Sequence, residues 1–185
     1  PALRPLKKPA QSREYASFTS IDKAAALIFK AKQPVILAGH SAVRNDASEA
    51  LTDFADSLKI PVVNTMMAKG IIPYTDPYSM WTVGIPQTDY QNKILDMADL
   101  IIAVGYDVVE FAPNKWNRDG KHKILHIDQR PSHINMLYQP EVEVIGDISY
   151  SLHHIQYRCE EKNEPEEIMK LKKEMVEEYE FYGKD

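Results

Sequence analysis

The chain has a single cysteine, Cys159, among its 185 residues. One cysteine cannot form an internal disulfide, which is typical of proteins from a reducing compartment, so we expect a cytoplasmic location. Cys159 lies in a polar stretch without a histidine or acid arranged to activate it, and we interpret it as a bystander thiol. Long apolar runs are also absent: none approaches the roughly 18 consecutive apolar residues of a membrane span. We therefore expect no membrane partner.

An excess of one charge is absent from most of the sequence. Residues 1–159 hold 17 acidic and 17 basic residues, so the net charge of −5 comes from residues 160–185, with ten acids and five lysines. No basic patch stands out, which argues against a nucleic-acid partner. We interpret the acidic end as the solvated face of a helix.

Motifs for cofactor, metal and nucleophile chemistry are missing as well. There is no G-x-G-x-x-G, no phosphate-binding loop, no H-E-x-x-H and no G-x-S-x-G. The six histidines are scattered over different predicted elements. They are His40, His122, His126, His133, His153 and His154. We therefore predict neither a metal site nor a catalytic set within this chain, and we expect His126, inside a β run, to be packed and hydrogen-bonded.

Short, continuous apolar runs alternate with amphipathic helices along most of the chain. The predicted strands are residues 34–38, 60–64, 100–104, 123–128 and, more weakly, 142–147. The predicted helices are residues 21–32 after Thr19-Ser20, 47–58 after Asn45-Asp46, a segment through 98 after Thr88-Asp89, and 148–158. Strands that are apolar on both faces indicate a parallel sheet covered by helices on both sides. The predicted fold is α/β, a three-layer α/β/α sandwich with a mostly parallel, Rossmann-like sheet.

Three segments follow from composition. Residues 1–18, with three prolines, read as an interdomain linker, and residues 19–160 form the central Rossmann-like domain. Residues 161–185 read as a C-terminal helix or linker toward a further domain, with Ile168, Leu171, Met175 and Tyr182 on one stripe. A chain that begins within a proline-rich run looks like the inside of a longer protein.

Ligands of open parallel sheets bind beyond the carboxyl ends of the strands, which directs attention to the loops there. Gly39 and Gly105 each follow a predicted strand and allow a sharp turn or a close approach to a ligand. Asp128 stands where an acid can hold a ribose hydroxyl or cap the next turn. The sequence leaves both alternatives open for each of these residues.

The order of these loops resembles the central domain of thiamine-diphosphate-dependent enzymes. The segments that carry the resemblance are residues 34–39, 60–65, 69–73, 76–77, 81–84, 98–105, 126–128 and 144–147. Residues 105–117, which read Gly-Tyr-Asp followed by Glu110, Phe111, Pro113 and Trp116-Asn117, resemble acetolactate synthases in particular. The resemblance covers about residues 20–158 and implies a structural, non-catalytic middle domain.

The resemblance implies a parent enzyme that condenses two pyruvates to 2-acetolactate with loss of carbon dioxide, as in branched-chain amino acid biosynthesis. Thiamine diphosphate and Mg²⁺ would be bound by its N-terminal and C-terminal domains, and this chain contains no Gly-Asp-Gly. The parent would be a homodimer or homotetramer. Alternatives are a 2-oxoacid decarboxylase or another carboligase of the family, or a stand-alone FAD- or NAD-binding module.

Flavin-containing members of the family hold FAD along these strand ends. The matching positions here are Gly39, His40, Thr65, Met66, Met67, Lys69, Gly84, Gly105 and Asp128. Two departures argue against FAD: His40-Ser41 replaces two glycines of a three-glycine turn, and Gly105-Tyr106-Asp107 lacks the family's arginine. The alternative is a vestigial pocket closed by His40, Met67 and Tyr106.

Overall fold

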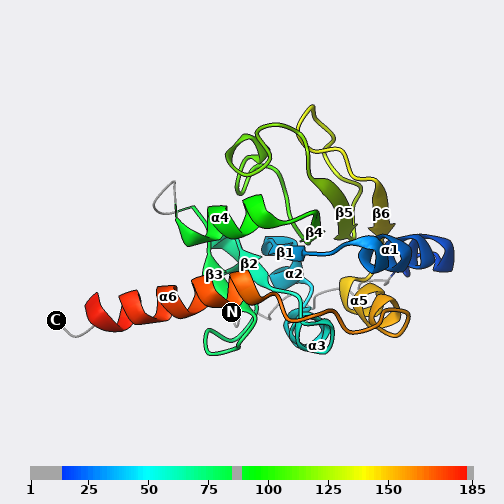
Figure 1. Ribbon diagram of the computed structural model, residues 1–185. Helices are drawn as coiled ribbons and strands as arrows, with labels where there is room; N and C mark the ends of the chain where they lie inside the picture. The colour runs from blue at the N-terminus through cyan, green and yellow to red at the C-terminus, as the bar shows by residue number, and fades with distance from the viewer. Residues whose placement is uncertain (1–13, 85–88, 183–185) are drawn as a thin grey trace, which may run out of the picture.

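A computed structural model describes residues 14–84 and 89–182 of the chain. Most of the predicted linker, Thr88 in the predicted cap and the last three residues lie outside the described residues. The predicted α/β sandwich is confirmed, because a parallel sheet lies between layers of helices (Figure 1).

The sheet of the described residues has six strands in the order β3-β2-β1-β4-β5-β6, and every neighbouring pair is parallel. The strands are β1 (Pro34–Ala38), β2 (Val62–Asn64), β3 (Ser79–Thr82), β4 (Leu100–Val104), β5 (Lys123–Asp128) and β6 (Val142–Ile145). The bounds predicted for β1, β4 and β5 are confirmed to the residue. The sequence predicts no strand between residues 64 and 100, and the structure adds the edge strand β3 there.

The two faces of the sheet are covered by different helices. Along β1, Ile36 and Ala38 pack with α1 (Phe18–Lys30), α3 (Ser48–Leu58) and α5 (Ile148–Gln156). Val35 and Leu37 pack on the other side with α4 (Tyr90–Met97). Successive side chains of a strand point to opposite faces, so a strand between two layers must be apolar throughout. This explains why the continuous apolar runs located these strands correctly.

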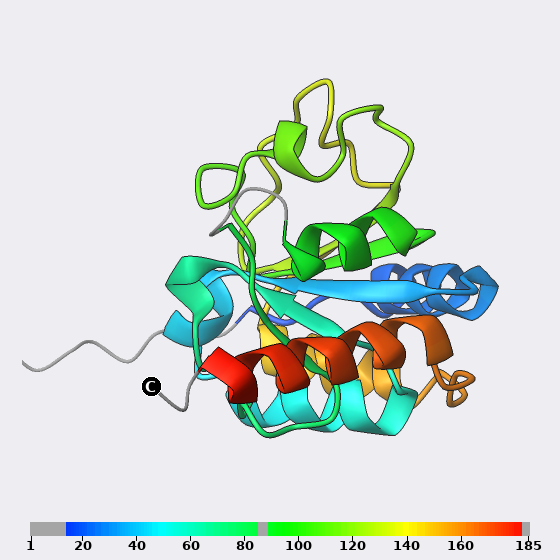
Figure 2. The same ribbon diagram turned by 60° about the vertical axis from the view of Figure 1, so that its left-hand side comes forward.

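The C-terminal helix α6 (Glu166–Tyr182) docks on the domain beside the edge strand β3 (Figure 2). Ile168 is fully buried and Met175 nearly so, both in the core layer that contains α4. Lys172 Nζ donates a hydrogen bond to the carbonyl oxygen of Ser79, at the start of β3. The predicted apolar stripe is confirmed at Ile168 and Met175, but Tyr182, in the last turn of α6, is exposed.

Two predicted helix starts are wrong. Helix α1 begins three residues early, because Ser17 rather than Thr19-Ser20 accepts the capping hydrogen bond from the Ser20 backbone N–H. Asn45 does not cap α3: it ends the short helix α2 (His40–Arg44) and donates its side-chain hydrogen bond backward, to the Ser41 carbonyl. None of the helices in the described residues is both long and apolar enough to cross a membrane.

Candidate ligand cleft

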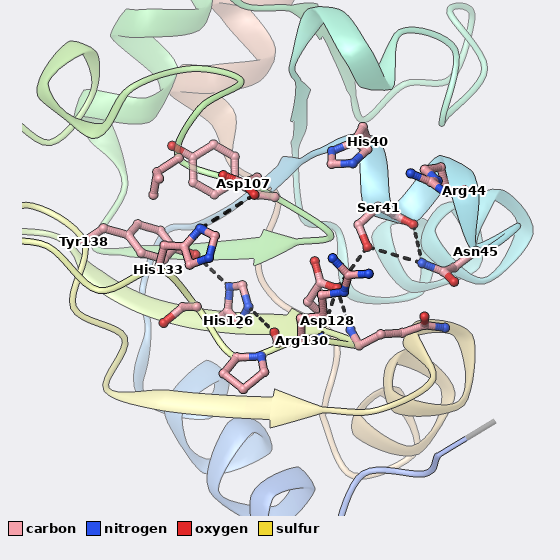
Figure 3. Close-up of a pocket in the computed structure, with 15 residues that line it drawn as sticks. His40, Ser41, Arg44, Asn45, Asp107, His126, Asp128, Arg130, His133 and Tyr138 are labelled. Atoms are coloured by element: carbon pink, nitrogen blue, oxygen red, sulfur yellow. Dashed lines mark hydrogen bonds and ion pairs between the residues drawn. The ribbon is translucent and has the colours of Figure 1, made fainter. Parts of the chain in front are cut away.

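A cleft of about 470 Å³ opens beyond the carboxyl ends of β1, β4 and β5 (Figure 3). The strand order reverses between β1 and β4, which is where ligands of doubly wound sheets bind. Its walls come from α2 and from the loops after β4 and β5. The lining residues are His40, Ser41, Arg44, Asn45, Tyr106, Asp107, Val108, His126, Asp128, Gln129, Arg130, Pro131, Ser132, His133 and Tyr138.

Glu110, which the sequence analysis did not single out as a site residue, is the buried charge beside this cleft. Its side chain is only 3% exposed. The carboxylate accepts hydrogen bonds from the backbone N–H groups of His40, at 3.0 Å, and of Asp107, also at 3.0 Å. It also accepts one from Thr65 Oγ1, at 2.6 Å, and lies 2.8 Å from His40 Nδ1. Donors from three loops therefore converge on one carboxylate.

The local sequence explains how Glu110 returns to the end of β1. Gly105 has a φ of +60°, which turns the chain away from β4. Asp107 then accepts hydrogen bonds from the backbone N–H of Val109 on its side chain and from that of Glu110 on its carbonyl. Such aspartate-centred turns reverse the chain within a few residues. The turn directs the Glu110 side chain back toward α2.

The two strand-end glycines permit close contact between backbone segments. A methyl group at Gly39 would lie 2.5 Å from the carbonyl oxygen of Gly105 and from Tyr106 Cα. A methyl group at Gly105 would lie 2.1 Å from the backbone nitrogen of Ala42 in α2. The loop after β4 thus packs directly against the loop after β1 and the start of α2. Each glycine therefore allows a close approach, but the neighbour it admits is another backbone segment of this chain.

Asp128 caps the turn that follows β5. Its Oδ1 accepts hydrogen bonds from the backbone N–H groups of Gln129, at 2.5 Å, and Arg130, at 3.3 Å. The Ser41 hydroxyl donates a third bond to the same oxygen, at 2.9 Å. Asp128 therefore joins the β5 loop to α2 across the cleft (Figure 3).

A buried polar cluster forms the floor of the cleft. His126 Nε2 lies 3.1 Å from the Arg130 carbonyl, and because a carbonyl only accepts, this nitrogen carries the proton. His126 Nδ1 lies 2.9 Å from the Tyr138 hydroxyl, within hydrogen-bond distance. The prediction that His126 is packed and hydrogen-bonded is confirmed. Burial raises the pKa of Tyr138 and of Tyr106 above the ordinary tyrosine value, so both hydroxyls stay protonated.

The other positions expected to contact a cofactor lie away from the cleft. Met66 and Met67 belong to the 3₁₀ turn η1 (Met66–Ala68), and their side chains are exposed, as is Lys69. Gly84 follows β3 with a φ of +113° and faces Phe111. The structure thus brings Gly39, His40, Thr65 and Gly105 together around Glu110 and places Asp128 in the adjoining cleft. Met67 does not line this cleft, whereas His40 and the buried Tyr106 are among its lining residues.

The described residues contain no group of three or more His, Cys, Asp or Glu side chains that could hold a metal ion. Burial raises the pKa of the Cys159 thiol to about 11, which keeps it a thiol at neutral pH and agrees with its interpretation as a bystander. Tyr106 makes structural bonds: its hydroxyl donates to the Phe111 carbonyl and accepts from Trp116 Nε1. These groups hold the loop after β4 in place.

Comparison with known proteins agrees with this architecture. Residues 21–155 match the family described as "Thiamine pyrophosphate enzyme, central domain". The match covers most of the chain and includes all six strands of the described residues. The chain belongs to this family, and it corresponds to the central domain of such enzymes.

Individual proteins similar to this chain include acetolactate synthases and a glyoxylate carboligase. The chain is 33% identical over 144 residues to an acetolactate synthase of Bacillus subtilis, matching 77% of this chain and 25% of that protein. It is 36% identical over 135 residues to a probable acetolactate synthase large subunit of Methanocaldococcus jannaschii, and the match covers 69% of this chain and 22% of that protein. It is also 31% identical over 153 residues to a glyoxylate carboligase of Escherichia coli O157:H7, matching 80% and 24%. The chain spans about a quarter of the length of these relatives.

Proposed function

We propose that the chain is the structural middle domain of an acetolactate synthase-like enzyme that condenses two pyruvates to 2-acetolactate and releases carbon dioxide. The observation that carries the proposal is the family match over residues 21–155, combined with similarity to several acetolactate synthases. The relatives are about four times longer than the matched region, which leaves room for the domains that perform the reaction.

The geometry supports a scaffold role for this part of the enzyme. The polar groups at the strand ends bond to one another: Glu110 to the loops after β1, β2 and β4, and Asp128 to α2. These bonds hold the loops after β1, β2 and β4 against one another and link the loop after β5 to α2. This hydrogen bonding around the cleft supports a structural role, in which it holds the strand-end loops in place.

Thiamine diphosphate would supply the carbanion chemistry of the parent enzyme. The described residues do not fit its diphosphate and Mg²⁺, because they hold no group of acidic or other metal-binding side chains and no Gly-Asp-Gly occurs in the sequence. We assign both ligands to the domains that flank residues 19–160 in the parent. Residues 161–182, including the docked α6, then lead toward the C-terminal one.

A second candidate is a different carboligase of the same family, and the similarity to a glyoxylate carboligase favours it over a simple decarboxylase. The middle domain lies outside the reacting groups in this proposal, so its sequence separates the two reactions poorly. We place the parent in the cytoplasm, because the single cysteine of this chain suits a reducing compartment. From the family resemblance, we expect the parent to be a homodimer or homotetramer.

The decisive experiment uses the enzyme that contains this chain as its middle domain. With thiamine diphosphate, Mg²⁺ and pyruvate, we expect carbon dioxide release coupled to formation of 2-acetolactate, measured by colorimetry after acid decarboxylation to acetoin. Acetaldehyde as the main product would indicate a decarboxylase. Turnover of glyoxylate in preference to pyruvate would favour the second candidate.

A further inference from the structure

The backbone amides at the end of β1 are all used within the chain. The N–H of His40 donates to Glu110, that of Ser41 to the Gly105 carbonyl, at 3.0 Å, and that of Ala42 to the Gly39 carbonyl, at 3.2 Å. In doubly wound folds these amides at the start of the first crossover helix hold the diphosphate of a dinucleotide. None of the three is left to serve that purpose here.

The Glu110 carboxylate stands where such a diphosphate would need to be. A methyl group at Gly39 would meet Glu110 Oε1 at 2.7 Å, so the carboxylate rests directly on the glycine that must admit a ligand. It accepts from the His40 amide and, through Thr65 and Asp107, from the loops on both sides of the strand-order reversal. The Glu110 carboxylate, whose oxygens already accept hydrogen bonds, would also repel the negatively charged diphosphate of a dinucleotide.

The contact between the loop after β4 and α2, on one side of the carboxylate, is closed as well, while the adjoining cleft at Asp128 stays open. The loop after β4 packs so tightly on α2 that a methyl group at Gly105 would reach the Ala42 nitrogen at 2.1 Å. A dinucleotide crossing from β1 to β4 would have to separate these two segments and break the bonds to Glu110. FAD, which related synthases would hold along these strand ends, therefore does not fit the residues present.

We infer that Glu110 is an internal anion that replaces the diphosphate of a dinucleotide at the β1–β4 reversal and closes the domain to FAD and NAD. This inference concerns ligand exclusion by this chain and does not depend on which carboligase reaction the parent enzyme performs. It also argues against a stand-alone FAD- or NAD-binding module, because the strand-end amides that would hold the diphosphate are already bonded within the chain.

The first test is direct titration of the purified chain with FAD and with NAD, followed by flavin fluorescence and by calorimetry. We expect no saturable binding, with any dissociation constant weaker than about 1 mM. Stoichiometric binding of FAD or NAD in the micromolar range would overturn the inference, whatever the reaction of the parent enzyme. This titration uses the unmodified chain, so it tests the inference even if substitution of Glu110 prevents folding.

The second test is chemical rescue of Glu110→Ala by acetate. The substitution removes a CH₂–COO⁻ group, which acetate matches in size and charge, so acetate should refill the site. We expect the Tm of Glu110→Ala to rise with sodium acetate along a saturating curve, beyond the effect of sodium chloride at equal ionic strength. Glu110→Gln, whose amide still fills the space, and Glu49→Ala, at an exposed position of α3, should show no acetate-specific rise. A folded Glu110→Ala variant that responds equally to both salts would refute an anion site.

Discussion

Helix α6 has two side chains buried in the core, and its other contacts, such as those of Lys172 and Tyr179 with Tyr74 and Trp81, lie at the surface of the domain. Ile168 and Met175 are its buried anchors, while Tyr179 and Phe181 near its end are exposed. A fully buried aliphatic side chain contributes about 1.5–3 kcal/mol, so the two anchors give about 3–6 kcal/mol. The entropy of ordering the helix offsets part of this. The net docking free energy is therefore smaller than the roughly 5–15 kcal/mol that stabilises a whole domain.

We expect Ile168→Ala to release α6 locally while the sheet stays folded. Truncation of a buried isoleucine to alanine costs about 2–5 kcal/mol, and even 2 kcal/mol corresponds to about a 30-fold increase in an opening equilibrium. In hydrogen exchange followed by mass spectrometry, amides of Glu166–Tyr182 should exchange about 30-fold faster than in the unmodified chain. Amides of β1 and β4 should keep their rates.

The matched control is Phe181→Ala, on the same helix but 73% exposed, which should leave exchange of the buried part of α6 unchanged. Two results would refute the reasoning. Equal acceleration in β1 and β4 would mean that α6 unfolds only together with the sheet, and unchanged exchange in α6 would mean that Ile168 does not anchor it.

Three further predictions concern packing, charge and reactivity. Gly105→Ala should lower the free energy of unfolding in urea by at least about 3 kcal/mol, because its methyl group meets Ala42 and φ is positive, whereas Gly70→Ala, with open space around it, should cost about 1 kcal/mol. Burial lowers the pKa of Lys172 to about 8 in the folded chain, below its ordinary value of 10.5, so the unfolded chain binds more protons between these values and stability should rise with pH from about 8 to 10.5. Lys172→Met should flatten that rise in urea titrations, and parallel curves would contradict the assignment. Because its pKa is raised to about 11, Cys159 should react with a thiol reagent at pH 8 more than tenfold slower in the native chain than in urea.

The sequence was sufficient for those parts of the fold that depend on local pattern. β1, β4 and β5 are apolar on both faces, and this made their bounds visible. Strand β3 was missed because Ser79–Thr82 is a short edge strand of mixed polarity, fixed by pairing with β2 rather than by its own composition. Helix α2 was missed because five residues cannot show a helical period.

The candidate site was less predictable because its central contacts join residues far apart in the sequence. Gly39, His40, Thr65 and Gly105 were identified from their positions at strand ends, and the structure does bring them together. Glu110 was missed, since its proximity to them depends on the turn after β4 and on the β1–β4 pairing. A glutamate three residues after Gly-Tyr-Asp, in a loop that returns to the strand ends, was the available signal.

The most direct test of a scaffold role is the activity of the isolated chain. Purified residues 1–185, supplied with saturating thiamine diphosphate, Mg²⁺ and pyruvate, should release no carbon dioxide and form no acetolactate above the rate of a heat-denatured sample. Saturable, pyruvate-dependent formation of acetolactate by this chain alone would place catalytic groups within it and contradict the assignment.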